Sequence, residues 1–267
     1  MGAHPTAIEF RSPEQLDGRY GDPVPDAIFA HARLARVYDA FDGDRDDLAA
    51  YLEIAEELAA RRVLDVGCGT GSLAILLARS RHTAVGVDPA EASLEVAKSK
   101  AHAASVTWIH GDATEVPALD ADLATMTGNV AQVFLTDNDW AQALRSIHAA
   151  LRPNGYLVFE TRRPERRAWE EWAADTEPVT LDIPDSGQVE RRLAVTDVSL
   201  PFVSFRYTYR FLADGAVVTS DSALRFRSRD EVESSLAANG YRTLDIREAP
   251  DRPGREFVFI AERSPLK

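Results

Sequence analysis

The feature that most constrains the fold of this chain is the stretch VLDVGCGTGS, residues 63–72. An apolar run with one acidic residue enters a loop in which Gly67, Gly69 and Gly71 occupy alternating positions, and the apolar segment 73–78 follows at once. This pattern predicts a buried strand, a sharp turn and a helix, the opening unit of a nucleotide-type α/β domain. Glycine suits the turn because a ligand can approach its backbone where a Cβ would intrude.

Composition narrows the class of protein. The 267 residues contain 45% hydrophobic and 27% charged side chains, which is ordinary for a globular enzyme with one large domain or a domain with an insertion. A net charge of −13 argues against nucleic acid or an anionic membrane surface as a partner. Cys68 is the only cysteine, so no intrachain disulfide can form, and we interpret it as a small residue in a tight turn.

The chain shows neither a membrane span nor a leader by composition. No apolar run reaches the roughly 18 residues that a span requires. The first residues lack the apolar centre of a signal peptide. We therefore predict a cytoplasmic protein whose partner is a small molecule, with a homodimer as a further expectation and no metal site.

Strands and helices alternate after the glycine loop. The patterns predict further strands at residues 83–88, 106–110, 121–127 and 156–161. Asp88 ends the second strand, where its carboxylate can accept hydrogen bonds from both hydroxyls of a ribose; capping of a helix at 89–100 is the alternative. Asp112 follows the third strand and can accept from an adenine amine or stabilise a turn. Asn129 and Gln132 follow the fourth strand, at the same edge of the sheet.

The regions flanking this alternation follow other patterns. Residues 1–23 predict a tail or arm, and residues 25–60 predict two helices. The segment 38–45 between these helices is either a lid over a ligand or a plain turn. We place the N-terminal arm and lid at 1–60, the core at 61–161 and 228–267, and an antiparallel insertion at 162–227.

The insertion is predicted from turn signals and from a period of two. Asp185-Ser186-Gly187 and Asp214-Gly215 are typical of hairpin turns. Between them, aromatic residues alternate with polar residues over 205–211, which predicts strands with an aromatic face and a polar face. A helix at 229–239 and strands at 242–246 and 256–261 then complete the core.

The glycine loop alone leaves the ligand open. Gly69-Thr70-Gly71-Ser72-Leu73-Ala74 satisfies the looser dinucleotide pattern G-x-G-x-x-A, so an NAD(P)-dependent oxidoreductase remains an alternative. Asp65 beside the loop and Asp112 on the same rim would repel a pyrophosphate. A nucleoside with a cationic tail, such as S-adenosylmethionine, suits these acids better.

At this point four motifs resemble those of the class I S-adenosylmethionine-dependent methyltransferases. They are VLDVGCGTG at 63–71, the acid Asp88, the segment Gly111-Asp112-Ala113, and LRPNG at 151–155, in which Asn154 replaces a glycine of the family pattern. The resemblance implies a Rossmann-like seven-stranded sheet in the order 3-2-1-4-5-7-6 with an antiparallel last strand. It also implies methyl transfer from S-adenosyl-L-methionine to a small-molecule acceptor, with S-adenosyl-L-homocysteine as product. A cofactor-binding protein without catalysis is a further alternative.

The resemblance also implies that the insertion at 162–227 covers an acceptor pocket, and it assigns two sets of residues. The donor site comprises Asp65, Gly67, Cys68, Gly69, Thr70, Gly71, Asp88, Pro89, Gly111, Asp112, Ala113, Thr127, Gly128 and Asn129. The predicted acceptor pocket comprises Tyr38, Phe41, Gln132, Arg162, Trp169, Tyr207 and Tyr209, although packing of the added sheet also explains its aromatic members.

Methyl transfer from a sulfonium is an in-line displacement that depends on alignment and exclusion of water. A base is needed only when the acceptor must lose a proton. Glu160, at the end of the fifth strand, and His110 are the candidates. Ion pairing of Glu160 with Arg162 or Arg163 is the competing interpretation.

Overall fold

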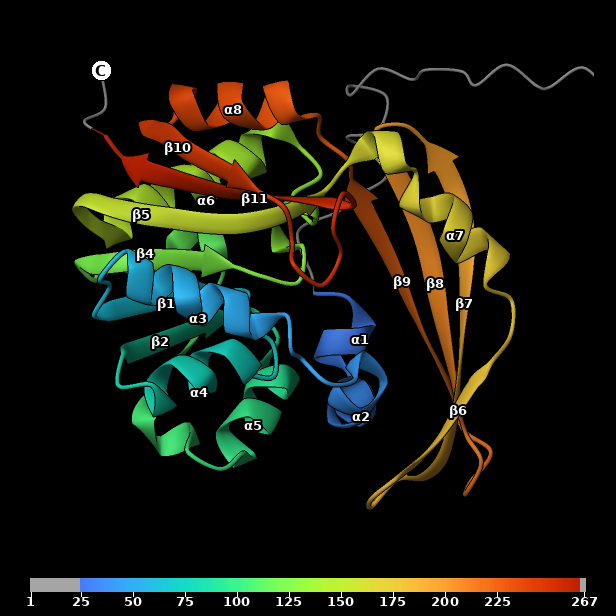
Figure 1. The fold of residues 1–267 in the computed structure, drawn as a ribbon. Helices are drawn as coiled ribbons and strands as arrows, with labels where there is room; N and C mark the ends of the chain where they lie inside the picture. The colour runs from blue at the N-terminus through green and yellow to red at the C-terminus, as the bar shows by residue number, and fades with distance from the viewer. Residues whose placement is uncertain (1–24, 265–267) are drawn as a thin grey trace, which may run out of the picture.

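A seven-stranded sheet forms the centre of the computed structural model, which describes residues 25–264 (Figure 1). The predicted tail or arm at 1–23 lies outside the described residues. The strands are β1 (Arg62–Val66), β2 (Thr83–Asp88), β3 (Val106–His110), β4 (Ala121–Met126), β5 (Leu151–Arg162), β10 (Tyr241–Arg247) and β11 (Glu256–Arg263). Their order, β10-β11-β5-β4-β1-β2-β3, is 3-2-1-4-5-7-6 when these strands are counted along the chain. Since β11 is antiparallel to both neighbours, the predicted fold class is confirmed.

Helices cover both faces of this sheet. α3 (Leu48–Glu57), α4 (Ser72–Arg79) and α5 (Glu91–Ser99) lie on one face, and α6 (Asp137–Ala150) and α8 (Arg229–Ala238) lie on the other (Figure 1). Short 3-10 helices, η2 (Ala103–Ser105), η3 (Ala113–Glu115), η4 (Val130–Gln132) and η5 (Pro164–Arg166), join the elements. Parallel strands are buried on both faces, and most residues of β1 are accordingly apolar. The buried Asp65 is an exception within this strand.

The register brings the predicted polar residues to one edge of the sheet. Val66 pairs with Val87, Asp88 pairs with His110, and Asp65 pairs with Thr125. The ends of β1, β2 and β3 therefore lie side by side, with the glycine loop between β1 and α4. Ligands of open α/β sheets bind at this edge.

The N-terminal region differs from the two predicted helices. The first one is broken at His31, whose ψ of 120° is extended, into α1 (Ala27–Ala30) and α2 (Ala32–Asp42). The residues from Tyr38 to Asp42 continue α2, so the plain turn predicted over 38–45 is wrong for its first five positions. The Thr70 hydroxyl donates to Asp39 Oδ1 at 2.5 Å, which ties α2 to the glycine loop.

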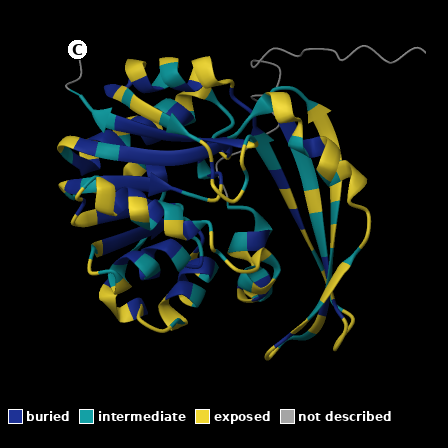
Figure 2. Cartoon of the chain, in the orientation of Figure 1, coloured by how far each residue is buried: buried dark blue, intermediate teal, exposed yellow. Residues whose placement is uncertain are grey.

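A second sheet follows β5. Helix α7 (Ala168–Ala174) precedes β6 (Val179–Ile183), β7 (Gly187–Ser199), β8 (Phe202–Phe211) and β9 (Val217–Arg225), which pair antiparallel in chain order. On β8, Tyr209 and Phe211 are buried while Arg206 and Arg210 are exposed, which confirms the predicted period of two. Figure 2 shows a largely buried central sheet beside strands of mixed exposure in this second sheet.

The apolar face of the second sheet packs on the N-terminal helices. Ile28, Leu34 and Val37 of α1 and α2 contact Val189 of β7 and Tyr209 of β8 in one buried cluster. Burial of each large apolar side chain contributes roughly 1.5–3 kcal/mol. The helices α1 and α2 are therefore held between the core and the second sheet (Figure 1), and the hydrogen bond from Thr70 to Asp39 joins α2 to the glycine loop.

Two elements begin two or more residues away from their predicted starts. α5 begins at Glu91, two residues later than expected, because its N-cap residue Ala90 has an extended backbone, with φ −91° and ψ 100°. β5 begins at Leu151, five residues early, because Leu151 pairs with Ala121 while Asn154, at φ +58°, forms the predicted turn within the strand. Over residues 25–264, every helix is too short or too polar to cross a membrane.

Candidate functional site

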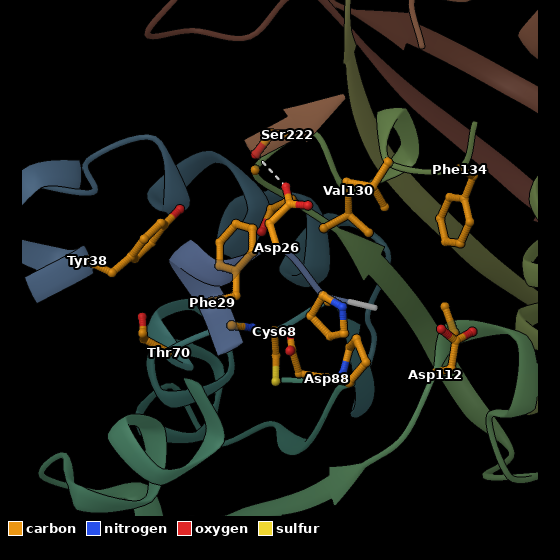
Figure 3. A pocket seen from close by; sticks show the side chains of 18 of the residues that line it. Asp26, Phe29, Tyr38, Cys68, Thr70, Asp88, Asp112, Val130, Phe134 and Ser222 are labelled. Carbon is orange, nitrogen blue, oxygen red and sulfur yellow. Dashed lines mark hydrogen bonds between the residues drawn. The ribbon is translucent and has the colours of Figure 1, made fainter. Parts of the chain in front are cut away.

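A cavity of about 690 Å³ lies at the edge where the parallel strands end. This volume is within the roughly 300–1,000 Å³ that is usual for small-molecule sites. Three parts of the chain line it: the strand ends and loops of the core, the N-terminal helices, and the strands β7, β8 and β9. Figure 3 shows Asp88 and Cys68 from the core below Asp26 and Ser222, which come from the start of α1 and from β9.

The Asp88 carboxylate anchors the glycine loop. Its Oδ2 accepts a hydrogen bond from the Gly69 N–H at 2.8 Å, and its Oδ1 accepts from the Ala90 N–H at 2.8 Å. Burial raises the pKa of Asp88, and the two backbone hydrogen bonds oppose that rise. The N-cap of α5 is Ala90 and has no side-chain cap hydrogen bond, so the helix-capping alternative for Asp88 is wrong. The Asp88 carboxylate lines the cavity at the end of β2, a position that the ribose interpretation fits.

Asp65 lies deeper, beneath the glycine loop. It is 2% exposed, and the Thr125 hydroxyl donates to its Oδ1 at 3.0 Å. Burial raises its pKa to about 7, the Thr125 hydrogen bond lowers it, and Asp88 raises it again. Near neutral pH the site therefore holds a carboxyl group that a nearby cation would ionise.

Asp112 has a structural contact as well as a place on the cavity wall. Its carboxylate accepts from the Thr114 N–H at 2.7 Å and caps the short helix η3. It also lines the cavity at the end of β3. The turn interpretation is thus correct, and the adenine interpretation fits the same position.

Most of the predicted donor residues line this one cavity. Those on its wall are Asp65, Gly67, Cys68, Gly69, Thr70, Asp88, Pro89, Asp112, Ala113, Thr127 and Gly128. Gly71 and Gly111 lie outside the wall, as does the buried Asn129, whose amide donates to Glu160 and Glu256. The Cys68 thiol is 8% exposed and burial raises its pKa, so it remains protonated at neutral pH.

The two candidate bases are elsewhere. Glu160 is 1% exposed and accepts hydrogen bonds from the Tyr51 hydroxyl and from the N–H groups of Gly128 and Asn129. It holds the loop after β4 from behind, outside the cavity wall. We therefore correct the assignment of Glu160 as a base. Its carboxylate already accepts these hydrogen bonds, and it lies outside the cavity where a substrate would bind.

Pairing of Glu160 with the following arginines is also wrong. Arg162 lies 3.7 Å from Glu256, and Arg163 lies 3.2 Å from Glu248. His110 is exposed, with Nε2 3.0 Å from the Pro89 carbonyl oxygen, and it too lies outside the cavity wall. The geometry therefore removes both residues as candidate bases.

Of the predicted acceptor residues, only Tyr38 lines the cavity. Phe41, Tyr207 and Tyr209 pack in the cluster between α2 and the second sheet, and Trp169 packs against Phe226. The remaining two predicted acceptor residues, Arg162 and Gln132, are hydrogen-bonded to each other: Arg162 Nη1 donates to Gln132 Oε1 at 3.2 Å. For Phe41, Tyr207 and Tyr209 the correction has one cause: the aromatic face of β8 points at the N-terminal helices.

Sequence reasoning missed the residues that form the other wall of the cavity. They are Asp26 and Phe29 from the N-terminal region, and Thr196, Ser204, Phe205, Asp221, Ser222 and Ala223 from the second sheet. Asp26 precedes an apolar helical run, so its sequence context indicates only a helix cap. The strand β9 has no aromatic pattern that would single it out.

Charge on the cavity wall is mostly negative. The acidic lining residues are Asp26, Asp65, Asp88, Asp112, Asp139 and Asp221. Among the described lining residues the single cationic side chain is Arg45, which is held by ion pairs of 2.9 Å to Asp42 and to Asp47. Within residues 25–264, no cluster of His, Cys, Asp and Glu is arranged to hold a metal ion.

The sheet order, the glycine loop after β1 and the acids at the ends of β2 and β3 together form a Rossmann-like core with a ligand site at its strand ends. Residues 63–155 match the family model described as a methyltransferase domain. The chain shares its fold with solved S-adenosylmethionine-dependent methyltransferases.

Individual relatives to which the chain is similar are also described as methyltransferases. An uncharacterized methyltransferase of Oceanobacillus iheyensis is 34% identical over 128 residues, which cover 48% of this chain and 56% of that protein. The chain spans about half the length of the curated relatives it matches.

Two solved structures share the fold over nearly their whole length. One is an amino pentose methyltransferase from Micromonospora echinaspora with S-adenosylmethionine bound; the TM-score is 0.64 at 24% identity, and the match covers 85% of this chain and 97% of that one. The other is a sugar N-methyltransferase from Streptoalloteichus, with a TM-score of 0.71 at 19% identity and 99% of each chain covered.

Proposed function

We propose that this protein transfers a methyl group from S-adenosylmethionine to a small-molecule acceptor bound between the core and the second sheet. The observation that carries the proposal is the continuity of the cavity. A single space of about 690 Å³ joins the glycine loop and the strand-end acids to residues of α1, β8 and β9. A donor and an acceptor can therefore meet without crossing protein.

The donor half of the cavity fits the proposed donor chemically. When bound, S-adenosylmethionine supplies a methyl group on a positively charged sulfur. The loop backbone at Gly67 and Gly69 admits the methionine part, and the Asp88 carboxylate accepts hydrogen bonds from the ribose hydroxyls. Asp112 accepts from the adenine amine. The carboxylate of Asp65 adds negative charge where the donor is cationic.

The residues of the second wall align the acceptor and exclude water. Methyl transfer needs the attacking atom in line with the carbon–sulfur bond, and the gain from such alignment can reach roughly 7–11 kcal/mol. Phe29, Val130, Phe134 and Phe205 supply apolar surface around this space. Two solved structures that share this fold are an amino pentose methyltransferase and a sugar N-methyltransferase, which supports a small-molecule acceptor here.

Calorimetry with S-adenosylhomocysteine and with NAD tests the proposal. We expect S-adenosylhomocysteine to bind and NAD to show no measurable heat, because the lining acids repel a pyrophosphate. Binding of NAD alone would overturn the proposal in favour of an oxidoreductase. Transfer of labelled methyl from the donor to any member of a small-molecule library then separates an enzyme from a protein that only binds the donor.

Two further expectations belong to this proposal. A cytoplasmic location accords with an abundant cytoplasmic donor, and fractionation of the producing cells tests it. A homodimer is tested by light scattering of the purified protein, for which a mass of 29.4 kDa indicates the monomer.

A further inference from the structure

Asp26 is placed like a helix cap but does not act as one. It precedes α1 at the N-cap position, with φ −54° and ψ 148°, and its side chain makes no capping hydrogen bond. The Ile28 N–H that a cap would satisfy donates instead to the Ser220 hydroxyl of β9 at 2.8 Å. The carboxylate of Asp26 therefore does not accept the backbone hydrogen bond that an N-cap side chain usually accepts.

The carboxylate turns toward the cavity. Its Oδ2 accepts a hydrogen bond from the Ser222 hydroxyl of β9 at 2.5 Å, and both residues line the cavity wall (Figure 3). Among residues 25–264, Oδ1 makes no hydrogen bond and no cationic side chain pairs with Asp26. Ser222 therefore fixes the carboxylate in one orientation and leaves one oxygen for a ligand.

The residues around Asp26 determine which charge a ligand must carry to bind there. Asp221 also lines this wall, but Arg206 pairs with it at 2.6 Å. The other side chains from the second sheet on the wall are hydroxyl-bearing or apolar, with the Phe205 ring among them. A carboxylate beside aromatic rings attracts an ammonium group and repels an anion.

Resting on the methyl transfer proposed above, we infer that the acceptor carries a basic amine and that Asp26 is the residue that binds it and takes its proton. The ammonium form of the acceptor gives one proton to Asp26 Oδ1. The nitrogen lone pair then attacks the methyl carbon while the carbon–sulfur bond breaks and its electron pair stays on sulfur. The products are a methylated ammonium and a neutral thioether, and the proton on Asp26 passes to water.

The position of Asp26 favours this proton transfer. Burial raises the pKa of its carboxyl, Asp221 raises it further, and the Ser222 hydrogen bond opposes the rise. The difference in acidity between the carboxyl and an ammonium, whose pKa is about 10, therefore becomes smaller. An aliphatic alcohol lacks both the positive charge and an acidic proton, so it gains neither attraction nor activation from this group.

The test uses the full chain saturated with S-adenosylhomocysteine and three probes on one carbon skeleton: benzylamine, benzyl alcohol and benzoate. Binding is followed by protein NMR titration. We expect benzylamine to bind at least about tenfold more tightly than the other two, as a charge-assisted hydrogen bond provides. Equal binding of the three probes, or binding of none, would overturn the inference.

Two matched variants locate the effect. Asp26→Asn retains the hydrogen bond with Ser222 and should abolish the preference for benzylamine, with affinity for S-adenosylhomocysteine within about twofold of the parent because no donor contact is lost. Asp221→Asn, the same change at the acid held by Arg206, should alter benzylamine affinity by less than about threefold. Retention of the preference in Asp26→Asn would refute the role of Asp26.

These outcomes remain separate from those of the proposed function. Failure of the parent protein to bind S-adenosylhomocysteine would contradict methyl transfer itself. Normal donor binding without a preference for amines would contradict only the inference about Asp26 and the acceptor.

Discussion

The half of the cavity that we propose for the donor and the half that we propose for the acceptor, here called the donor half and the acceptor half, are built over different distances along the chain. In the donor half, Asp88 bonds to Gly69, 19 positions away, within one strand–helix–strand unit. In the acceptor half, Asp26 bonds to Ser222, 196 positions away, and Ile28 bonds to Ser220, 192 positions away. The donor half is therefore formed by residues that lie close together in the sequence, and the glycine loop motif identifies it. The acceptor half exists only when both ends of the fold have come together.

The difference has consequences for how each half responds to change. The donor half depends on backbone shape and on buried carboxylates that are held by neighbouring N–H groups. The acceptor half depends on the apolar cluster between the N-terminal helices and the second sheet and on the hydrogen bonds that join Asp26 and Ile28 to Ser222 and Ser220 of β9. We therefore expect substitutions in the donor half to affect stability and donor binding, and substitutions in the acceptor half to leave donor binding intact.

The largest effect is expected at Gly71. Its φ is +80°, and an added Cβ would lie 2.9 Å from Ala97 Cβ and 2.9 Å from Trp108 Cζ3. Gly71→Ala should lower the free energy of unfolding by about 2–5 kcal/mol through strain and overpacking. Denaturant unfolding measures this change.

Gly69→Ala is the matched control for that substitution. Its φ of +52° carries similar strain, but its Cβ would meet nothing within 4 Å. We expect a loss of stability of only about 1–2 kcal/mol, with weaker donor binding because the new methyl group enters the cavity. Equal destabilisation by the two variants would contradict the packing argument.

Donor affinity should fall most at Asp88. Asp88→Ala removes the carboxylate proposed to bind the ribose and the contacts that anchor Gly69 and Ala90. Loss of two charge-assisted hydrogen bonds predicts a decrease in S-adenosylhomocysteine affinity of about 100-fold or more. Calorimetry provides the measurement, and Asp182→Asn, at an exposed site on β6, is the control for net charge. An unchanged affinity in Asp88→Ala would remove the ribose role.

Asp65 should make donor binding depend on pH. Its pKa of about 7 means that the carboxyl is mostly protonated at pH 6 and mostly ionised at pH 8. A cationic donor favours the ionised form, so affinity for S-adenosylmethionine should rise with pH by up to about tenfold over this interval. Asp65→Asn should flatten the profile. A profile that is flat in the parent or unchanged in the variant would argue against this coupling.

Protein stability should show the opposite slope through the same group. Because the pKa of Asp65 is higher in the folded state than the ordinary 3.8, the folded protein binds the proton more tightly than the unfolded chain. Its contribution to stability is complete below about pH 4 and is lost as the pH rises through about 7. Asp65→Asn removes this contribution, which unfolding at several pH values can measure.

The smallest effect is expected at Ser222. Ser222→Ala removes one hydrogen bond to Asp26 and should lower the free energy of unfolding by about 1 kcal/mol. Donor affinity should stay within about twofold, because this hydrogen bond joins the residue before α1 to β9 and includes no donor-half residue. A large loss of donor affinity would show that the two halves are energetically coupled. It would contradict the expectation that substitutions in the acceptor half leave donor binding intact.

The sequence allowed much of the donor half to be predicted, for a local reason. Strand, glycine loop and helix are consecutive, so their residues predict one another at short range. Asp88 and Asp112 were found because the ends of parallel strands meet at one edge of a sheet. Glu160 was placed correctly at the end of its strand, but its side chain points to Tyr51 and to the loop after β4. The direction of a side chain at a strand end depends on which residues pack around it, and those residues come from distant parts of the sequence.

The acceptor half shows the limit of periodicity. Alternation on β8 predicted an aromatic face and a polar face, and both exist. It did not predict which element would cover the aromatic face. Tyr207 and Tyr209 therefore appeared suited to an acceptor pocket, although α1 and α2 cover them. The residues that do line that wall, such as Asp26 and Ser222, lie in short polar contexts without a motif.

What the sequence by itself determined is the core and its donor loop, because residues 63–88 form a unit whose glycines, apolar runs and acids lie close together along the chain. The tertiary structure alone decided the acceptor wall. Packing of α1 and α2 against the second sheet turns Asp26 away from its own helix and toward Ser222. Contacts between residues almost 200 positions apart leave no periodic signal, since only the folded core brings them within hydrogen-bond distance.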